Sequence, residues 1–115
     1  MKLAINLAKV REGLTGENPS VGCLIVKDDQ IISIGQTGLG GRPHAENVAI
    51  NNSFQNLTGS KMYVTLEPCN HYGKTPPCTK VIIQSGINEV LYPINDIDSK
   101  VKGKSFEILK KKILK

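Results

Sequence analysis

The sequence predicts one α/β domain with a partly parallel central sheet. Three observations support this class. Segments of helical and strand-like periodicity alternate along the chain, two early strands are separated by a two-residue turn, and 115 residues suffice for one compact domain. A hydrophobic content of 39% and a charged content of 22% are those of an ordinary globular protein. We therefore expect helices on both faces of a mixed sheet that begins with an antiparallel hairpin.

The individual elements follow from the spacing of apolar residues, about 3.6 in helices and two in strands. Residues 21–27 form an almost uninterrupted apolar run, which predicts a strand buried on both faces. Asp28-Asp29 then makes the hairpin turn, and four glycines between positions 35 and 41 predict a loop that bends or approaches another group closely. The expected elements are helix 3–10, strands 21–27 and 31–35, a helix from Pro43, strand 62–66, a helix that starts near residues 75–78 with Thr75 as its cap and stops at Gly86, strand 88–92 and a final helix carrying Phe106, Leu109 and Ile113.

The net charge of +5 does not by itself indicate a nucleic-acid partner. Seven of the fifteen basic residues fall within the last sixteen positions, and such a basic end is usually a solvated face. Five aromatic residues are few for a base-stacking platform. No apolar run approaches the roughly 20 residues that span a bilayer, and no signal-peptide core is present. We expect a cytoplasmic protein with no membrane partner and no nucleic-acid partner.

The three cysteines lie in two different settings. Cys23 lies within the apolar run and is expected to behave as a small buried hydrophobic side chain. Cys69 and Cys78 lie in a polar, proline-rich stretch that could not bury them as core. An odd number of cysteines in a cytoplasmic chain argues against structural disulfides. Cys69 and Cys78 therefore call for another explanation.

Metal binding explains these two cysteines together with His44 and Glu46. Both pairs follow a predicted strand and lie where a helix begins, the position at which open α/β sheets place their ligands. A helix N-terminus favours thiolate, so Cys78 is expected to bind a soft divalent metal. Three protein ligands, His44, Cys69 and Cys78, leave a fourth tetrahedral position for water, as in catalytic zinc sites.

Each of these residues also has an ordinary structural interpretation. His44 could cap a helix, Glu46 could suit a first turn, and the cysteines could form a local disulfide or remain free thiols. The joint pattern favours the metal site. The metal site requires a particular geometry of His44 and Glu46, because residues two apart in a helix point about 200° away from each other. His44 and Glu46 converge only if His44 lies at or before the helix cap.

The same pattern resembles the zinc nucleobase deaminases, in which His-x-Glu precedes Pro-Cys and a later cysteine. Most of that superfamily has two residues between its cysteines, whereas here eight residues separate Cys69 from Cys78. This long spacer, preceded by Thr65-Leu66-Glu67-Pro68, resembles the deaminase domain of the bifunctional riboflavin-biosynthesis deaminase/reductase. The segments Asn18-Pro19-Ser20-Val21-Gly22 and Gly41-Arg42-Pro43-His44-Ala45-Glu46 extend the resemblance over nearly the whole chain.

The resemblance implies a three-layer α/β/α cytidine-deaminase-like fold, a Zn²⁺ cofactor and a phosphorylated pyrimidine substrate. The implied reaction removes the 2-amino group of 2,5-diamino-6-ribosylamino-4(3H)-pyrimidinone 5′-phosphate as ammonia. Glu46 is then the proton shuttle of the reaction. The implied substrate contacts are Asn18, His71, Lys74 and Thr75.

Two departures and two alternatives accompany this resemblance. The family often has histidine where this chain has Thr37, and we expect residues 1–115 to form a single deaminase domain without the reductase domain. Self-association into a homo-oligomer is compatible with so small a chain.

One alternative is a zinc deaminase acting on cytidine, guanine or tRNA adenosine. The other is a non-enzymatic zinc module for nucleic acid, which predicts His71 as a fourth protein ligand.

Overall fold

The computed structural model describes residues 1–68, 77–93 and 109–113. In these residues a five-stranded sheet has the strand order β2-β1-β3-β4-β5. The elements are α1 (Lys2–Val10), β1 (Gly22–Lys27), β2 (Gln30–Gln36), the short 3-10 helix η1 (Leu39–Gly41), α2 (Ala45–Asn52), β3 (Lys61–Val64), α3 (Cys78–Ser85), β4 (Glu89–Pro93) and β5 (Leu109–Ile113).

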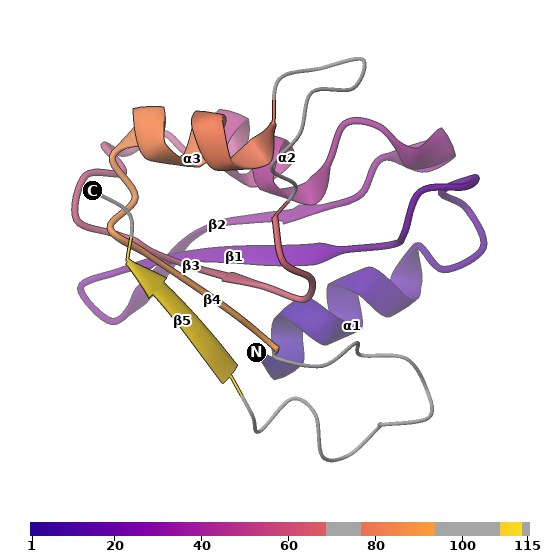
Figure 1. Ribbon diagram of the computed structural model, residues 1–115, viewed down its shortest axis with the longest axis horizontal. Helices are drawn as coiled ribbons and strands as arrows, with labels where there is room; N and C mark the ends of the chain where they lie inside the picture. Colours follow the sequence, from indigo (N-terminus) through magenta and orange to yellow (C-terminus); the bar gives the residue numbers. More distant parts are fainter. Residues whose placement is uncertain (69–76, 94–108, 114–115) are drawn as a thin grey trace.

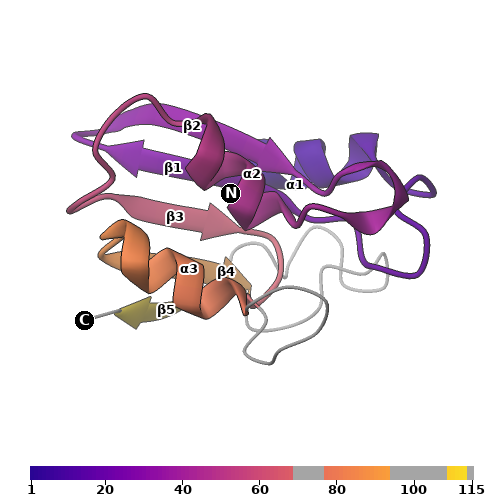
Figure 2. The same cartoon turned by 90° about the horizontal axis from the view of Figure 1, so that it is seen from above.

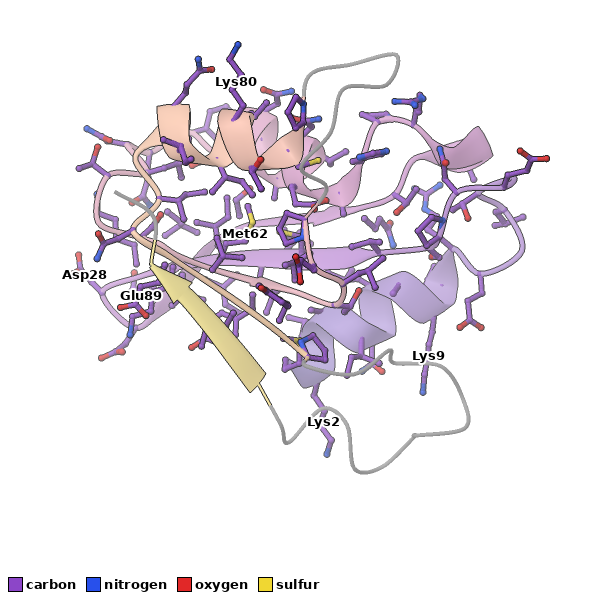
Figure 3. The ribbon with its side chains drawn as sticks, viewed as in Figure 1. Lys2, Lys9, Asp28, Met62, Lys80 and Glu89 are labelled. Atoms are coloured by element: carbon purple, nitrogen blue, oxygen red, sulfur yellow. The ribbon has the colours of Figure 1, made fainter. Side chains whose placement is uncertain are left out.

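Helices lie on both faces of the sheet, as the sequence predicts. Figure 1 shows α2 and α3 above the sheet and α1 below it, and Figure 2 shows α2 and α3 side by side over the strands. Met62 of β3 points into the interior beneath α2 and α3, whereas Lys80 on α3 and Lys9 on α1 point outward (Figure 3). The buried apolar core therefore fills the space between the sheet and the α2–α3 layer.

The predicted hairpin is formed by β1 and β2. Asp28 and Asp29 both have positive φ, 52° and 62°, which is the backbone of a type I′ turn. Lys27 pairs with Gln30 across this turn. The first four residues of β1 are buried, in agreement with the prediction of a strand covered on both faces.

The strand directions bring several chain segments to one edge of the sheet. β1 is antiparallel to both β2 and β3, and β3 is parallel to β4. The carboxyl ends of β2, β3 and β4 therefore lie at the same edge. The chain leaves β2 at this edge and enters α2, so the residues before α2 are expected to carry the site.

Close packing fixes the position of α2 against β2. An added Cβ atom at Gly35 would lie 2.4 Å from the carbonyl oxygen of Ala45 and 2.6 Å from the amide nitrogen of Ala49. The buried Ser33 hydroxyl of β2 also donates a hydrogen bond to the carbonyl oxygen of Ala49. The helix therefore lies directly on the strand, and its first turn cannot move far from the sheet.

Two predicted elements differ from the structure. The expected final helix is wrong, because Leu109–Ile113 forms β5 and pairs antiparallel with β4. A spacing of four between Leu109 and Ile113 satisfies the strand repeat of two as well as the helix repeat of 3.6, and the open edge of β4 decides between them. The second correction concerns the cap of α3. The helix begins at Cys78, within the expected start, but its N-cap is Pro77 and not Thr75.

The described part of the chain contains no helix that is long and apolar enough to cross a membrane. The cytoplasmic location and the oligomeric state remain predictions.

Candidate active site

His44 lies at the cap of α2, outside regular helical geometry. Its backbone is extended, with φ −68° and ψ 153°, while its carbonyl oxygen already accepts the first helical hydrogen bond from the amide of Val48 at 3.1 Å. Glu46 follows in the first turn of the helix. The condition that the sequence sets for convergence of these two side chains, with His44 at the cap, is thus met.

Cys78 opens α3 and lies beside His44. Pro77 is the N-cap of α3 with an extended backbone, and Cys78 is 1% exposed. The distance from His44 Nδ1 to Cys78 Sγ is 3.3 Å across 34 residues of sequence. An imidazole nitrogen and a thiol at a helix start form a donor pair that suits zinc, which prefers nitrogen and sulfur ligands.

Glu46 is buried next to this pair. The side chain is 5% exposed, and its burial raises the pKa of the carboxyl to about 7. Hydrogen bonds from its own backbone amide and from the Cys78 thiol oppose that increase in pKa. A carboxyl group with these properties suits proton transfer near neutral pH.

Cys23 is buried in the same region of the core and is fully inaccessible. Burial raises the pKa of its thiol, and the neighbouring Glu46 and Cys78 add to the effect. These properties agree with its predicted role as a small buried side chain.

A cavity of about 250 Å³ opens at this edge of the sheet. It brings the predicted residues Asn18, His44 and Glu46 together, and Thr37 also reaches it. The complete lining is Asn18, Pro19, Val21, Thr37, Arg42, His44, Glu46, Leu66 and Glu67.

Four predicted site residues, Cys69, His71, Lys74 and Thr75, lie outside the described residues. The donors within 1–68 and 77–93 include no group of three His, Cys, Asp or Glu side chains placed to hold a metal. The structure therefore supplies the His44–Cys78 pair, and the third predicted ligand belongs to the undescribed segment.

Comparison with known proteins identifies the family. Residues 1–94 match the model of the cytidine and deoxycytidylate deaminase zinc-binding region.

The chain belongs to this zinc-binding deaminase family.

Proteins similar to this chain include deaminases of riboflavin biosynthesis. The diaminohydroxyphosphoribosylamino-pyrimidine deaminase of Buchnera aphidicola subsp. Schizaphis graminum is 47% identical over 97% of this chain and 76% of its own length. The riboflavin biosynthesis protein RibD of Aquifex aeolicus is 46% identical over 96% of this chain, which spans only 31% of that protein. The crystal structure of a deaminase/reductase from Thermotoga maritima has a TM-score of 0.77 at 45% identity, covering 93% of this chain and 31% of that one.

The deaminase cavity contains two charged residues that the sequence analysis did not select, Arg42 and Glu67. Each lies two positions before a predicted ligand, Arg42 before His44 and Glu67 before Cys69. Position next to a ligand is the signal that could have identified them, because a side chain so close in sequence to a metal ligand often reaches the same cavity.

Thr37, where the family often has histidine, supports the cavity wall. Its side chain is 1% exposed, and its hydroxyl oxygen accepts a hydrogen bond from the amide of Val21 at 2.8 Å. The hydroxyl has the carbonyl oxygen of Pro19 as an acceptor at 3.3 Å. The threonine thus connects the end of β2 to the segment that leads from Asn18 into β1.

Replacing Thr37 tests this connection. Thr37→Val should lower the free energy of unfolding by about 1–3 kcal/mol, because it leaves the buried amide of Val21 without an acceptor. Thr37→Ser keeps the hydroxyl and should cost about 1 kcal/mol for the lost methyl group. Urea denaturation of both variants measures these losses, and a Thr37→Val variant as stable as the wild type would show that the hydroxyl contributes nothing.

Proposed function

We propose that this domain catalyses hydrolytic deamination of 2,5-diamino-6-ribosylamino-4(3H)-pyrimidinone 5′-phosphate. The products are 5-amino-6-ribosylamino-2,4-pyrimidinedione 5′-phosphate and ammonia, in riboflavin biosynthesis. The observation that carries the proposal is that the Cys78 thiol contacts both His44 and the buried Glu46, two residues that line the cavity. Relatives named for this deamination, at 46–47% identity, support the choice of substrate.

The proposed metal ligands are His44, Cys69 and Cys78. His44 and Cys78 already lie within 3.3 Å of each other, each held at the start of a helix on one sheet. Cys69 would complete a set of one nitrogen and two sulfur donors, which leaves one tetrahedral position open. Zinc, when bound there, supplies a Lewis acid that makes water nucleophilic near neutral pH.

Glu46 is the proposed proton carrier. Its carboxylate takes one proton of the attacking water and passes it to the ring nitrogen. As the tetrahedral intermediate collapses to the carbonyl, the carboxylate takes the remaining hydroxyl proton and passes it to the amine, which leaves as ammonia. Burial supports this role, because a carboxyl with a pKa of about 7 both accepts and releases a proton near neutrality. Its place in the first turn of α2, two residues after His44, keeps the carboxyl beside the metal site.

The remaining proposed contacts recognise the substrate. Asn18 lines the cavity with an amide suited to a ring edge. His71, Lys74 and Thr75 belong to the eight-residue spacer between Cys69 and Cys78, which is longer than metal geometry requires. A histidine and a lysine tethered between two ligands suit ribose and phosphate, and extra length at the mouth of a site usually serves recognition.

The proposal concerns the deamination step alone. The chain spans about a third of the RibD relatives and about three quarters of the Buchnera deaminases. No reductase activity is assigned to residues 1–115.

Zinc content tests the ligand set. We expect about one zinc per chain by elemental analysis, lost in Cys78→Ala because that change removes one of three protein ligands. Cys23→Ala is the matched control, since Cys23 is another buried cysteine of the same core. It should retain zinc and cost only about 1 kcal/mol of packing. Full zinc retention in Cys78→Ala would remove this residue from the site.

Turnover tests Glu46 and the substrate together. Glu46→Gln should keep zinc but lower turnover by about 10²–10⁴-fold, because an amide cannot accept the proton. Glu89→Gln, the same change at the start of β4, should leave turnover unaltered.

The assay follows ammonia release from the diaminopyrimidinone phosphate, cytidine and guanine in parallel. Faster release from cytidine or guanine would place this chain with a different branch of zinc deaminases.

A further inference from the structure

Two loops meet at the wall of the cavity, one before β1 and one before α2. The amide of Gly40 donates a hydrogen bond to the carbonyl oxygen of Leu14 at 2.8 Å, and Asn18 Nδ2 donates one to the carbonyl oxygen of Gly41 at 3.0 Å. Thr15 stabilises the turn that ends at Asn18, because its hydroxyl donates a hydrogen bond to the carbonyl oxygen of Asn18 at 2.7 Å. The Asn18 side chain is therefore attached to the loop that leads to His44.

The hydrogen bond to Gly41 fixes which way the Asn18 amide faces. A backbone carbonyl only accepts hydrogen bonds, so the NH₂ group of Asn18 must be the end that lies on Gly41. The oxygen Oδ1 is then the end of the amide left for a ligand. A side chain that in solution offers both donors and acceptors becomes, in this setting, an acceptor for an N–H or O–H group.

Gly41 leaves the space that the Asn18 side chain occupies. A Cβ atom at Gly41 would lie 2.7 Å from Asn18 Nδ2, 3.0 Å from Asn18 Cβ and 2.6 Å from the carbonyl oxygen of Thr15. Its neighbour Gly40 also has a positive φ, +81° against +100°, yet a Cβ atom there would meet nothing within 4 Å. Substitution of either glycine would therefore strain the backbone, but of the two only a side chain at Gly41 would contact Asn18.

We propose that Gly41 is a positioning residue for substrate binding that acts through Asn18. Its carbonyl holds the Asn18 amide, and its missing side chain makes room for that amide. Together they present Oδ1 to a hydrogen-bond donor on the substrate. This inference rests on the proposed function, because the substrate class with ring and exocyclic N–H groups supplies such donors.

Steady-state kinetics of four variants test the proposal. Gly41→Ala should raise KM about five- to tenfold, the effect of losing one hydrogen bond, with kcat and zinc content within about twofold of wild type. Gly40→Ala is the matched control and should keep KM within about twofold. In the Asn18→Ala background, Gly41→Ala should add no further rise in KM, because the group through which it acts is already absent.

An NMR measurement separates this inference from the proposed function. The side-chain NH₂ signals of Asn18, identified as the pair lost in Asn18→Ala, should shift in Gly41→Ala and stay in place in Gly40→Ala, whatever the substrate. Loss of zinc in Gly41→Ala would overturn the proposal, since the effect would then pass through His44. An equal rise in KM with and without Asn18, or unchanged NH₂ signals in Gly41→Ala, would also overturn it. Absence of turnover in the wild type would count against the proposed function only.

Discussion

The approach of His44 Nδ1 to Cys78 Sγ, at 3.3 Å, is the contact around which the rest of the site is arranged. It requires two helices to begin at the same edge of one sheet, which follows from β1 being antiparallel to both β2 and β3. It also requires α2 to lie close to the sheet, and the absence of a side chain at Gly35 permits that. The extended cap conformation of His44 then allows the imidazole and the Glu46 carboxyl to approach the same place.

Burial of the Glu46 carboxyl opposes folding but favours the proposed proton transfer. A buried carboxyl is unfavourable for folding, because the charged form loses its hydration, and this same loss raises its pKa. The Glu46 side chain is only 5% exposed, so its carboxyl has little contact with bulk water. Burial therefore makes Glu46 unfavourable for stability, but it keeps the carboxyl at the position where the proposed proton transfer takes place.

Much of this arrangement could be predicted from the sequence, because local signals determine it. The turn at Asp28-Asp29, the helix start after His44 and the αL cap at Gly86 all depend on residues within a few positions of each other. The error at Leu109–Ile113 has the opposite cause. A five-residue segment carries too little periodicity to distinguish helix from strand, and the free edge of β4 determines the outcome.

The residues that line the cavity were less predictable than the metal ligands, because contacts between segments distant in the sequence bring them together. The motif identified His44 and Glu46, but Arg42 and Glu67 line the cavity only because loops from different strands meet there. The attachment of Asn18 to Gly41 spans 23 residues, and no local pattern announces it. Thr37 supports the cavity wall through a hydrogen bond from the amide of Val21, which lies 16 residues away in the sequence.

X-ray absorption at the zinc edge of the purified protein tests the central claim most directly. The account predicts two sulfur donors at about 2.3 Å, one imidazole nitrogen at about 2.0–2.1 Å and one further light donor. That spectrum should be unchanged in His71→Ala. A second imidazole that disappears in His71→Ala, or a third sulfur that disappears in Cys23→Ala, would contradict an open site built on His44, Cys69 and Cys78.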